Sequence, residues 1–232
     1  MSVFTIGILG GMGPRATVYF ERMLIDRAEG TDQQIPRIVC INDGNIPDRT
    51  AFLTGGGEDP VPLLRRNAQL LLDAGANVIA IPCNTSHSAR ILDRLIDGLV
   101  LNIIHMPRVT VAAAKAANRH KLLILATVGT VQSGVYSEVD PLITCIYPNE
   151  ADQQIVSDII AKVKTGTKPA ELSTTLAKVI GNYEADAAIL ACTELSMVPI
   201  ETHAPMKTID ALATLADQCM LASNQASGGN GE

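Results

Sequence analysis

Two apolar segments of this 232-residue chain end in the same way, at a cysteine followed by small polar residues. They are Val78–Thr85, which contains Cys83, and Ala187–Glu194, which contains Cys192. A short apolar run followed by polar residues predicts a buried parallel strand that ends at the carboxyl edge of a sheet. Ligands bind at that edge in open α/β sheets. The chain is therefore constrained to a fold that brings two thiols, one from each half, to ligand-binding edges.

Strands and helices are predicted to alternate along the whole chain. Apolar runs predict strands at Thr5–Leu9, Arg37–Asn42, Val78–Pro82, Leu122–Thr127, Ile143–Tyr147 and Ala187–Ala191. Helical periodicity lies between them, at Arg15–Ala28 and at about 62–74, 86–97, 107–118, 151–164, 169–182 and 210–222. Strict alternation indicates an α/β fold in which helices flank mainly parallel sheets.

The two halves resemble each other. Ile8–Gly13 opens the first half, Ile124–Thr130 takes the same place in the second, and each precedes its cysteine segment by a similar interval. This pattern predicts an internal duplication with a boundary near residue 104. We expect a first α/β domain over 1–103 plus 210–222, which holds Cys83, and a second over 104–209, which holds Cys192. Residues 223–232 lack apolar anchors and are predicted to be disordered.

Composition and charge exclude several classes of function. The net charge is −6 and aromatic residues make up only 3%, which argues against a nucleic-acid partner. No apolar stretch reaches the roughly 18 residues that span a bilayer, and no basic leader is present, so we expect a cytoplasmic protein. The five cysteines are widely spread without a C-x-x-C pair, which excludes a disulfide framework and a zinc knuckle. Cys40, Cys145 and Cys219 are interpreted as packing residues.

The surroundings of the two remaining cysteines suit proton transfer. An enzyme that removes the α-proton of an amino acid without a cofactor needs a base near Cα and donors around the carboxylate. A thiolate can be that base where a helix N-terminus lowers its pKa, and both cysteines fall at predicted strand-to-helix junctions. Asn84 and Thr85 beside one thiol, and Thr193 beside the other, supply donors. Two thiols on opposite faces of one substrate can invert a stereocentre.

Six motifs, in order, resemble one family. They are Gly7–Pro14, Ile46–Ala51, Pro82–His87, Ala126–Tyr136, Val163–Gly166 and Cys192–Glu194. The likeness covers nearly the whole chain, and the six motifs together are specific although none suffices alone. The chain resembles the aspartate/glutamate racemases, and within them the aspartate racemase branch that uses no pyridoxal phosphate.

The resemblance implies two pseudo-symmetric α/β domains with the active site between them, a homodimer, no cofactor and a small acidic amino acid as substrate. Cys83 and Cys192 match the two acid/base cysteines, and Arg49 and Lys164 match the cations that hold the distal carboxylate, for which arginine suits bidentate binding. The other matching substrate-binding positions are Met12, Asn84, Thr85, Ser86, Thr127 and Thr193. Glutamate racemases carry Asp-Ser in the first loop and His after the second Cys-Thr; Gly10–Gly13 and Glu194 stand there instead, which points to the aspartate branch.

Three alternatives are weighed against a racemase. Gly11-Met12-Gly13 formally fits the phosphate loop of an NAD(P)-dependent oxidoreductase, but Pro14 lacks a helix-start N–H and no acidic residue follows at the required distance. A metal hydrolase is weaker, because no carboxylate–histidine cluster is present. A non-catalytic binding protein for acidic amino acids has no need of two thiols. We also predict that the loop at Gly55–Gly57 closes over the substrate.

Overall fold

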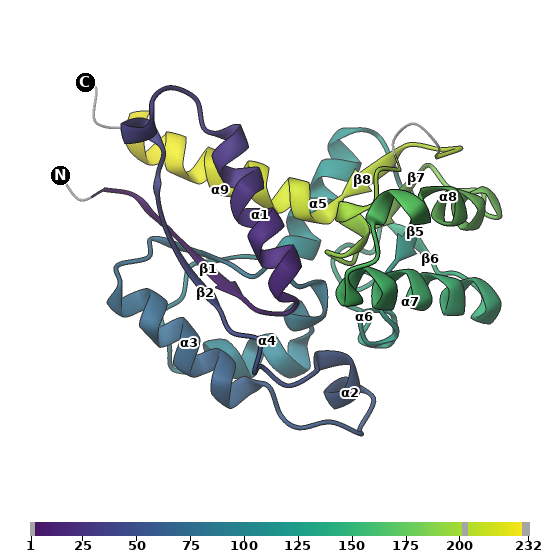
Figure 1. Ribbon diagram of the computed structural model, residues 1–232, viewed down its shortest axis with the longest axis horizontal. Helices are drawn as coiled ribbons and strands as arrows, with labels where there is room; N and C mark the ends of the chain where they lie inside the picture. Colours follow the sequence, from purple (N-terminus) through teal and green to yellow (C-terminus); the bar gives the residue numbers. More distant parts are fainter. Residues whose placement is uncertain (1–2, 201–203, 229–232) are drawn as a thin grey trace.

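The computed structural model describes residues 3–200 and 204–228. It contains two four-stranded parallel sheets, with strand orders β2-β1-β3-β4 and β6-β5-β7-β8 (Figure 1). The strands are β1 (Thr5–Gly10), β2 (Arg37–Asn42), β3 (Val78–Ala80), β4 (Ile103–Ile104), β5 (Lys121–Leu125), β6 (Thr144–Ile146), β7 (Ala187–Leu190) and β8 (Thr208–Asp210). The predicted α/β class with two parallel sheets flanked by helices is confirmed, and the identical strand order agrees with the similarity of the two halves.

The helices lie on both faces of each sheet. The α-helices are α1 (Pro14–Arg27), α2 (Arg49–Leu53), α3 (Val61–Asp73), α4 (Ala89–Ile96), α5 (Met106–Ala116), α6 (Val128–Gln132), α7 (Glu150–Thr165), α8 (Ser173–Gly181) and α9 (Ala211–Gly228). The short 3₁₀ helices are η1 (Asp32–Gln34), η2 (Asn84–His87), η3 (Pro169–Leu172) and η4 (Leu195–Met197).

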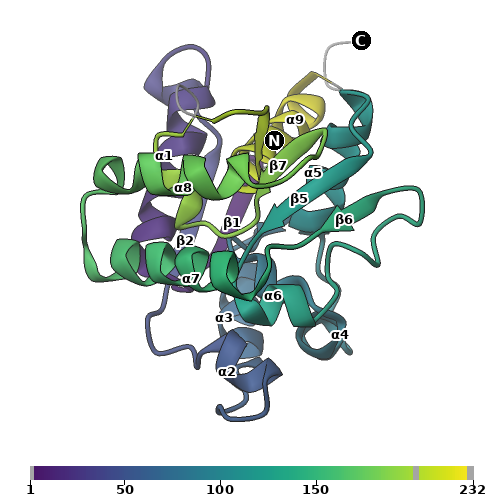
Figure 2. The ribbon, with the colours of Figure 1, turned by 90° about the vertical axis from the view of Figure 1, so that its right-hand side faces the viewer.

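Alternation along β1 divides the core of the first sheet. Ile6 and Ile8 pack under α1 and α9, and Leu9 packs under α3 and α4. Apolar residues on both faces require helices on both faces, because a parallel sheet has no side that tolerates water. The second sheet repeats the arrangement, with α7 and α8 on one face and α5 on the other (Figure 2).

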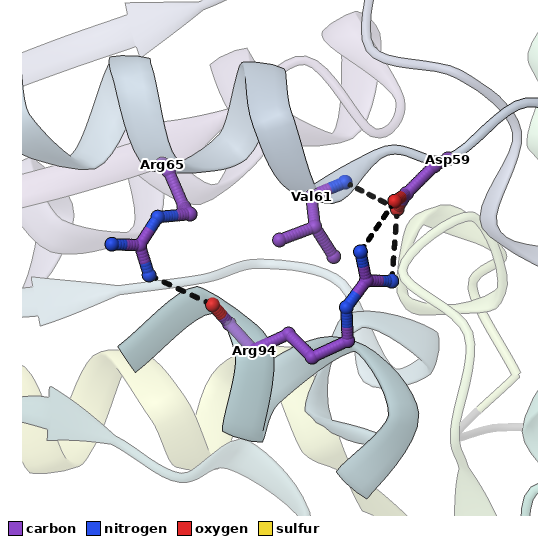
Figure 3. Close-up of polar contacts among 4 residues, drawn as sticks. All are labelled: Asp59, Val61, Arg65 and Arg94. Atoms are coloured by element: carbon purple, nitrogen blue, oxygen red, sulfur yellow. Dashed lines mark hydrogen bonds and ion pairs between the residues drawn. The ribbon is translucent and has the colours of Figure 1, made fainter. Parts of the chain in front are cut away.

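Helices α3 and α4 are joined by polar contacts as well as by packing. The guanidinium of Arg94 in α4 donates to both carboxylate oxygens of Asp59, at 3.2 and 2.5 Å (Figure 3). Asp59 also accepts from the backbone N–H of Val61 at the start of α3. Arg65 of α3 donates to the backbone carbonyl of Arg94 at 2.8 Å. These bonds fix the chain that leads from α2 into α3.

The structure differs from the sequence-based predictions in several elements. The helix predicted at 86–97 is broken at Ser88, whose ψ of 142° is extended, into η2 and α4. The edge strands β4 and β8 were not predicted, because two or three half-buried residues carry no pattern. Helix α9 continues to Gly228 and thus into the tail predicted to be disordered, because alanine, serine, asparagine and glutamine can prolong a helix whose earlier turns are packed. Residues 229–232 of that tail lie outside the described residues.

Helix α9 returns from the second sheet to the first. Its residues Leu212, Leu215 and Cys219 are buried against Ile6 and Ile8 of β1. In Figure 1 the helix lies beside α1 along the first sheet. Within the described part of the chain, no helix is long and apolar enough to cross a membrane.

Candidate active site

The two cysteines line one cleft. Strand β3 ends at Ala80 and leads to Cys83 at the N-terminal boundary of η2, and β7 ends at Leu190 and leads to Cys192 before η4. Both side chains are buried, with exposed fractions of 5% and 6%. Both thiols lie in the same cavity wall, which places one from each sheet against a common space.

Nine of the ten predicted site residues line this cleft. They are Met12, Arg49, Cys83, Asn84, Thr85, Thr127, Lys164, Cys192 and Thr193. The tenth, Ser86, does not; its hydroxyl is fully buried and contacts the sulfur of Met12 at 3.2 Å. The sequence reasoning missed Asp48, Thr50, Ala191 and Glu194, which also line the cleft. Asp48 and Glu194 stand inside motifs already singled out, so proximity to Arg49 and Cys192 was an available signal.

The cleft is narrow and opens beside a larger pocket. Its volume is about 20 Å³, close to that of one water molecule. The adjoining pocket measures about 240 Å³ and shares four residues with the cleft: Asp48, Arg49, Lys164 and Glu194. The space between the thiols is therefore smaller than an amino acid, and the larger pocket lies next to it.

Beside Cys83, hydroxyl and amide groups form hydrogen bonds between residues that follow the first sheet's strand β3 and residues that follow the second sheet's strand β5. Tyr136 donates its hydroxyl to Oδ1 of Asn84 at 2.6 Å, and Thr85 Oγ1 lies 2.8 Å from Thr130 Oγ1 and 3.2 Å from Thr127 Oγ1. Because the tyrosine fixes Oδ1 as the acceptor, Nδ2 of Asn84 carries the free N–H donors, and it is buried without a partner. An unpaired buried donor costs free energy, so this amide suits a carboxylate ligand.

Arg49 is a buried cation that forms no ion pair among the described residues. It is 8% exposed, and three backbone carbonyls hold its guanidinium: those of Ile46, Pro47 and Met12. These bonds use three of the five N–H donors, and the buried Nε is left without a partner. Among the described residues, neither Arg49 nor Lys164 forms an ion pair with an acidic side chain. The cleft therefore presents two cations to an anionic group.

Glu194 occupies the other side of the cleft. The thiol of Cys192 donates to its Oε2 at 3.1 Å, and the hydroxyl of Thr193 lies 3.2 Å from the same oxygen. Burial, followed by the negative charge of Glu194, raises the pKa of the Cys192 thiol well above its ordinary value, although Lys164 acts in the opposite direction. The expectation that the local helix start lowers the pKa of both thiols is therefore wrong for Cys192, because burial and a neighbouring carboxylate outweigh a short 3₁₀ helix.

Helix α2, which follows β2 of the first sheet, lines the cleft with Arg49 and Thr50. It packs closely against α6, which follows β5 of the second sheet. Asp48 caps α2 by accepting from the N–H of Ala51 at 2.7 Å, which places Arg49 at the first helical position. A side chain on Gly129 of α6 would place its Cβ 2.8 Å from Cα of Thr50. On its outer side, α2 is held by Arg90, which donates to the carbonyl of Leu53 at 2.8 Å. The absence of a side chain at Gly129 therefore permits the close packing of α2 against α6.

The glycine loop after β1 serves internal packing. Gly11 has a φ of 93°, and a Cβ there would lie 2.1 Å from the carbonyl oxygen of Asp43. Its N–H is already bonded to the hydroxyl of Thr17 at 2.9 Å. A phosphate loop needs free N–H groups for its ligand, so this geometry speaks against a bound dinucleotide.

The other cysteines pack as predicted. Cys40 lies in β2, Cys145 in β6 and Cys219 in α9. Burial raises the pKa of Cys40 to about 11 and that of Cys219 to about 12, which disfavours their thiolate forms at neutral pH. Within residues 3–200 and 204–228, no group of three or more His, Cys, Asp or Glu side chains could hold a metal ion.

Comparison with known proteins gives one family. Residues 9–219 match the family described as Asp/Glu/Hydantoin racemase. The broad specificity amino-acid racemase of Bacillus subtilis (strain 168) is 28% identical over 91% of this chain and 94% of its own length.

Solved structures give the same relationship. The aspartate racemase of Picrophilus torridus is 32% identical, with a TM-score of 0.85 over 95% of this chain and 94% of that one. The fold is also that of the glutamate racemase of Thermus thermophilus, which is 19% identical with a TM-score of 0.68, over 99% of this chain and 84% of that one.

Proposed function

Because this chain belongs to the Asp/Glu/hydantoin racemase family, and is thereby an isomerase, we propose that it interconverts L- and D-aspartate without pyridoxal phosphate. The observation that carries the proposal is the cleft shared by Cys83 and Cys192, one thiol from each sheet. The aspartate racemase of Picrophilus torridus, at 32% identity, supports the choice of substrate. The broad-specificity relative from Bacillus subtilis makes glutamate and other amino acids necessary comparisons.

The cleft offers a place for each part of aspartate. The two cations, Arg49 and Lys164, are proposed to bind the distal carboxylate, since neither has an acidic partner among the described residues. The unpaired amide N–H groups of Asn84 and the hydroxyl of Thr85 are proposed to bind the α-carboxylate. This placement leaves Cα between the two thiols.

The proposed reaction removes a proton from one face of Cα and delivers a proton to the opposite face. One cysteine, as thiolate, takes the Cα proton, and the electron pair stays on Cα beside the carboxylate. The opposite thiol then gives its proton to the other face of Cα, which inverts the centre. Donors around the α-carboxylate stabilise the negative charge that develops during the transfer.

The test is proton NMR of L-aspartate and of D-aspartate in D2O with the purified chain and no added cofactor. We expect the α-proton signal of both enantiomers to disappear while the optical rotation decays to zero. Cys83→Ser and Cys192→Ser should each abolish racemisation and leave aspartate binding measurable by calorimetry. Wild-type binding without exchange of any amino acid would refute the proposal in favour of a binding protein.

A homodimer is also proposed, as the family resemblance implies. It is supported by exposed apolar side chains on two adjacent helices: Val18 and Ile25 of α1 and Leu221 of α9. Light scattering on the purified chain tests it, and a monomeric mass at micromolar concentration would refute it.

A further inference from the structure

A third cation stands beside the pocket that adjoins the thiols. This pocket, which we call the outer pocket, measures about 240 Å³ and is lined by Arg15 in addition to Arg49 and Lys164. Arg15 is the second residue of α1, and Lys164 lies in the last turn of α7. Arg15 does not line the cleft between the thiols, whereas the other two cations line both spaces. The outer pocket therefore has a cation of its own.

The end of α7 sets the position of the Arg15 guanidinium. A Cβ on Gly166, the residue that ends α7, would lie 3.2 Å from Nη2 of Arg15. The last carbonyls of a helix carry partial negative charge, which favours a cation at this place. Among the described residues, Arg15 forms no ion pair with an acidic side chain. The guanidinium is thus held across the gap between α1 and α7, and its charge is available to a ligand.

The balance of charge favours an anion in the outer pocket. Its three cations stand against two carboxylates, Asp48 and Glu194, and both of these already accept hydrogen bonds from within the protein. A second pocket, of about 250 Å³ between α2, α6 and α7, also adjoins the cleft, but only Lys164 and Asp48 contribute charge to it. The acidic end of a side chain is therefore drawn towards Arg15 rather than towards α6.

We propose that the outer pocket is a second carboxylate site, in which Arg15 selects acidic amino acids with side chains longer than that of aspartate, of the class of 2-aminoadipate. The inference rests on the proposed racemase function, since Cα stays between the thiols, and adds the residue that discriminates side-chain length. Arg49 and Lys164 line both spaces and hold the carboxylate of a short side chain. A longer side chain passes them and reaches Arg15, whose planar guanidinium suits bidentate binding of a carboxylate.

The outer pocket has room for the additional carbon atoms. Its volume of about 240 Å³ is twelve times the 20 Å³ of the cleft. Pro14, Ile46 and Val163 line it beside the cations, and such apolar side chains suit the methylene groups that precede the distal carboxylate. A pocket with apolar walls and a cation at its edge matches a hydrocarbon chain that ends in a carboxylate.

The test compares three amino acids by calorimetry and by loss of the α-proton signal in D2O: aspartate, 2-aminoadipate, and norleucine, which matches 2-aminoadipate except for its distal carboxylate. The wild type should bind 2-aminoadipate at least about 10-fold more tightly than norleucine. In Arg15→Gln, Kd for 2-aminoadipate should rise by about 10-fold to 100-fold, while Kd and kcat for aspartate change by less than about 3-fold. Arg15→Lys should recover part of the loss, since it keeps the charge without the planar fork.

The matched control is Arg66→Gln, at an exposed arginine of α3 that lines neither the cleft nor the outer pocket; it should leave all three dissociation constants unchanged. Equal increases of Kd for aspartate and 2-aminoadipate in Arg15→Gln would overturn the proposal, because a long-range field acts on every anion alike.

The failure of this carboxylate site is distinguishable from the failure of the racemase. Wild-type protein that exchanges the α-proton of aspartate but binds 2-aminoadipate no better than norleucine would refute the site and retain the racemase. A loss of 2-aminoadipate binding in Arg15→Gln, in a chain that exchanges no α-proton, would refute the racemase and retain the site.

Discussion

Replacing Gly129 by alanine should hold the cleft open. The added Cβ would lie 2.8 Å from both Cα and Oγ1 of Thr50, and the contact with the backbone Cα cannot be relieved by turning a side chain. Carbon atoms in contact sit about 3.5–4.0 Å apart, so α2 must retreat from α6 by about 0.7 Å or more. Thr50 and Arg49 are adjacent in α2 and both line the cleft. The retreat therefore displaces the Arg49 guanidinium from its position opposite the thiols.

The effect on stability is predicted to be small and the effect on activity large. Overpacking costs about 1–3 kcal/mol, and the better helix propensity of alanine offsets up to about 1 kcal/mol of it. The net loss in free energy of unfolding is therefore about 0–3 kcal/mol. A displacement of about 1 Å at a reacting site can cost about 100-fold in rate, so kcat for racemisation should fall by about 10-fold to 100-fold.

The assay is circular dichroism of the enantiomer pair over a range of aspartate concentrations, with urea unfolding of the same samples. Gly181→Ala is the matched control, since this glycine also lies in a helix but its Cβ would meet nothing closer than Pro205 at 3.5 Å. It should leave kcat unchanged. If Gly129→Ala keeps kcat within 2-fold of the wild type, closure of α2 against α6 is not part of the working state.

Three further predictions follow from single groups. Arg49→Lys removes the free guanidinium N–H groups and should raise KM for aspartate by about 10-fold to 100-fold, measured by initial rates; an unchanged KM would place the distal carboxylate elsewhere. Tyr136→Phe removes the hydroxyl that donates to Oδ1 of Asn84 and should lower the free energy of unfolding in urea by about 1–3 kcal/mol. An unchanged free energy of unfolding would mean that Oδ1 accepts from another donor. Burial lowers the pKa of His87 to about 3 and that of His105 to about 4, so the unfolded chain binds more protons below pH 6.5. Stability should therefore be full above about pH 6.5 and fall as the pH drops towards 4, and a flat profile of the unfolding free energy would contradict it.

The main layers of the fold were predictable from sequence because they follow from local patterns. Each of the six predicted strands is present, since a run such as Ala187–Ala191 has to be buried on both faces. The ends were harder to predict. The run at Val78–Pro82 stops pairing at Ala80, because the backbone turns there towards Cys83. The strand β8 could not be predicted, since it is defined only by pairing with β7.

The sequence was enough to predict which residues line the site, but it did not predict the contacts that hold them there. Spacing and resemblance predicted that Cys83, Cys192 and Arg49 share one cleft, and all three line it. That three carbonyls hold Arg49, or that Gly129 meets Thr50, depends on contacts between segments far apart in the chain. No one-dimensional pattern encodes such a distance.

The inequality of the two thiols also follows from tertiary contacts. The sequence places a cysteine after a buried strand in each half, and from that repeat alone the two sites should be equivalent. The residues after each cysteine break the equivalence, because Asn84 is tied to Tyr136 and Glu194 is tied to Cys192 itself. A carboxylate beside Cys83 as well would face a substrate that itself carries two carboxylates, and the repulsion among them would weaken binding. The cleft holds two cations, Arg49 and Lys164, and two carboxylates, Asp48 and Glu194. A third carboxylate in the place of Asn84 would therefore leave a net negative charge in a pocket that is proposed to bind an acidic amino acid.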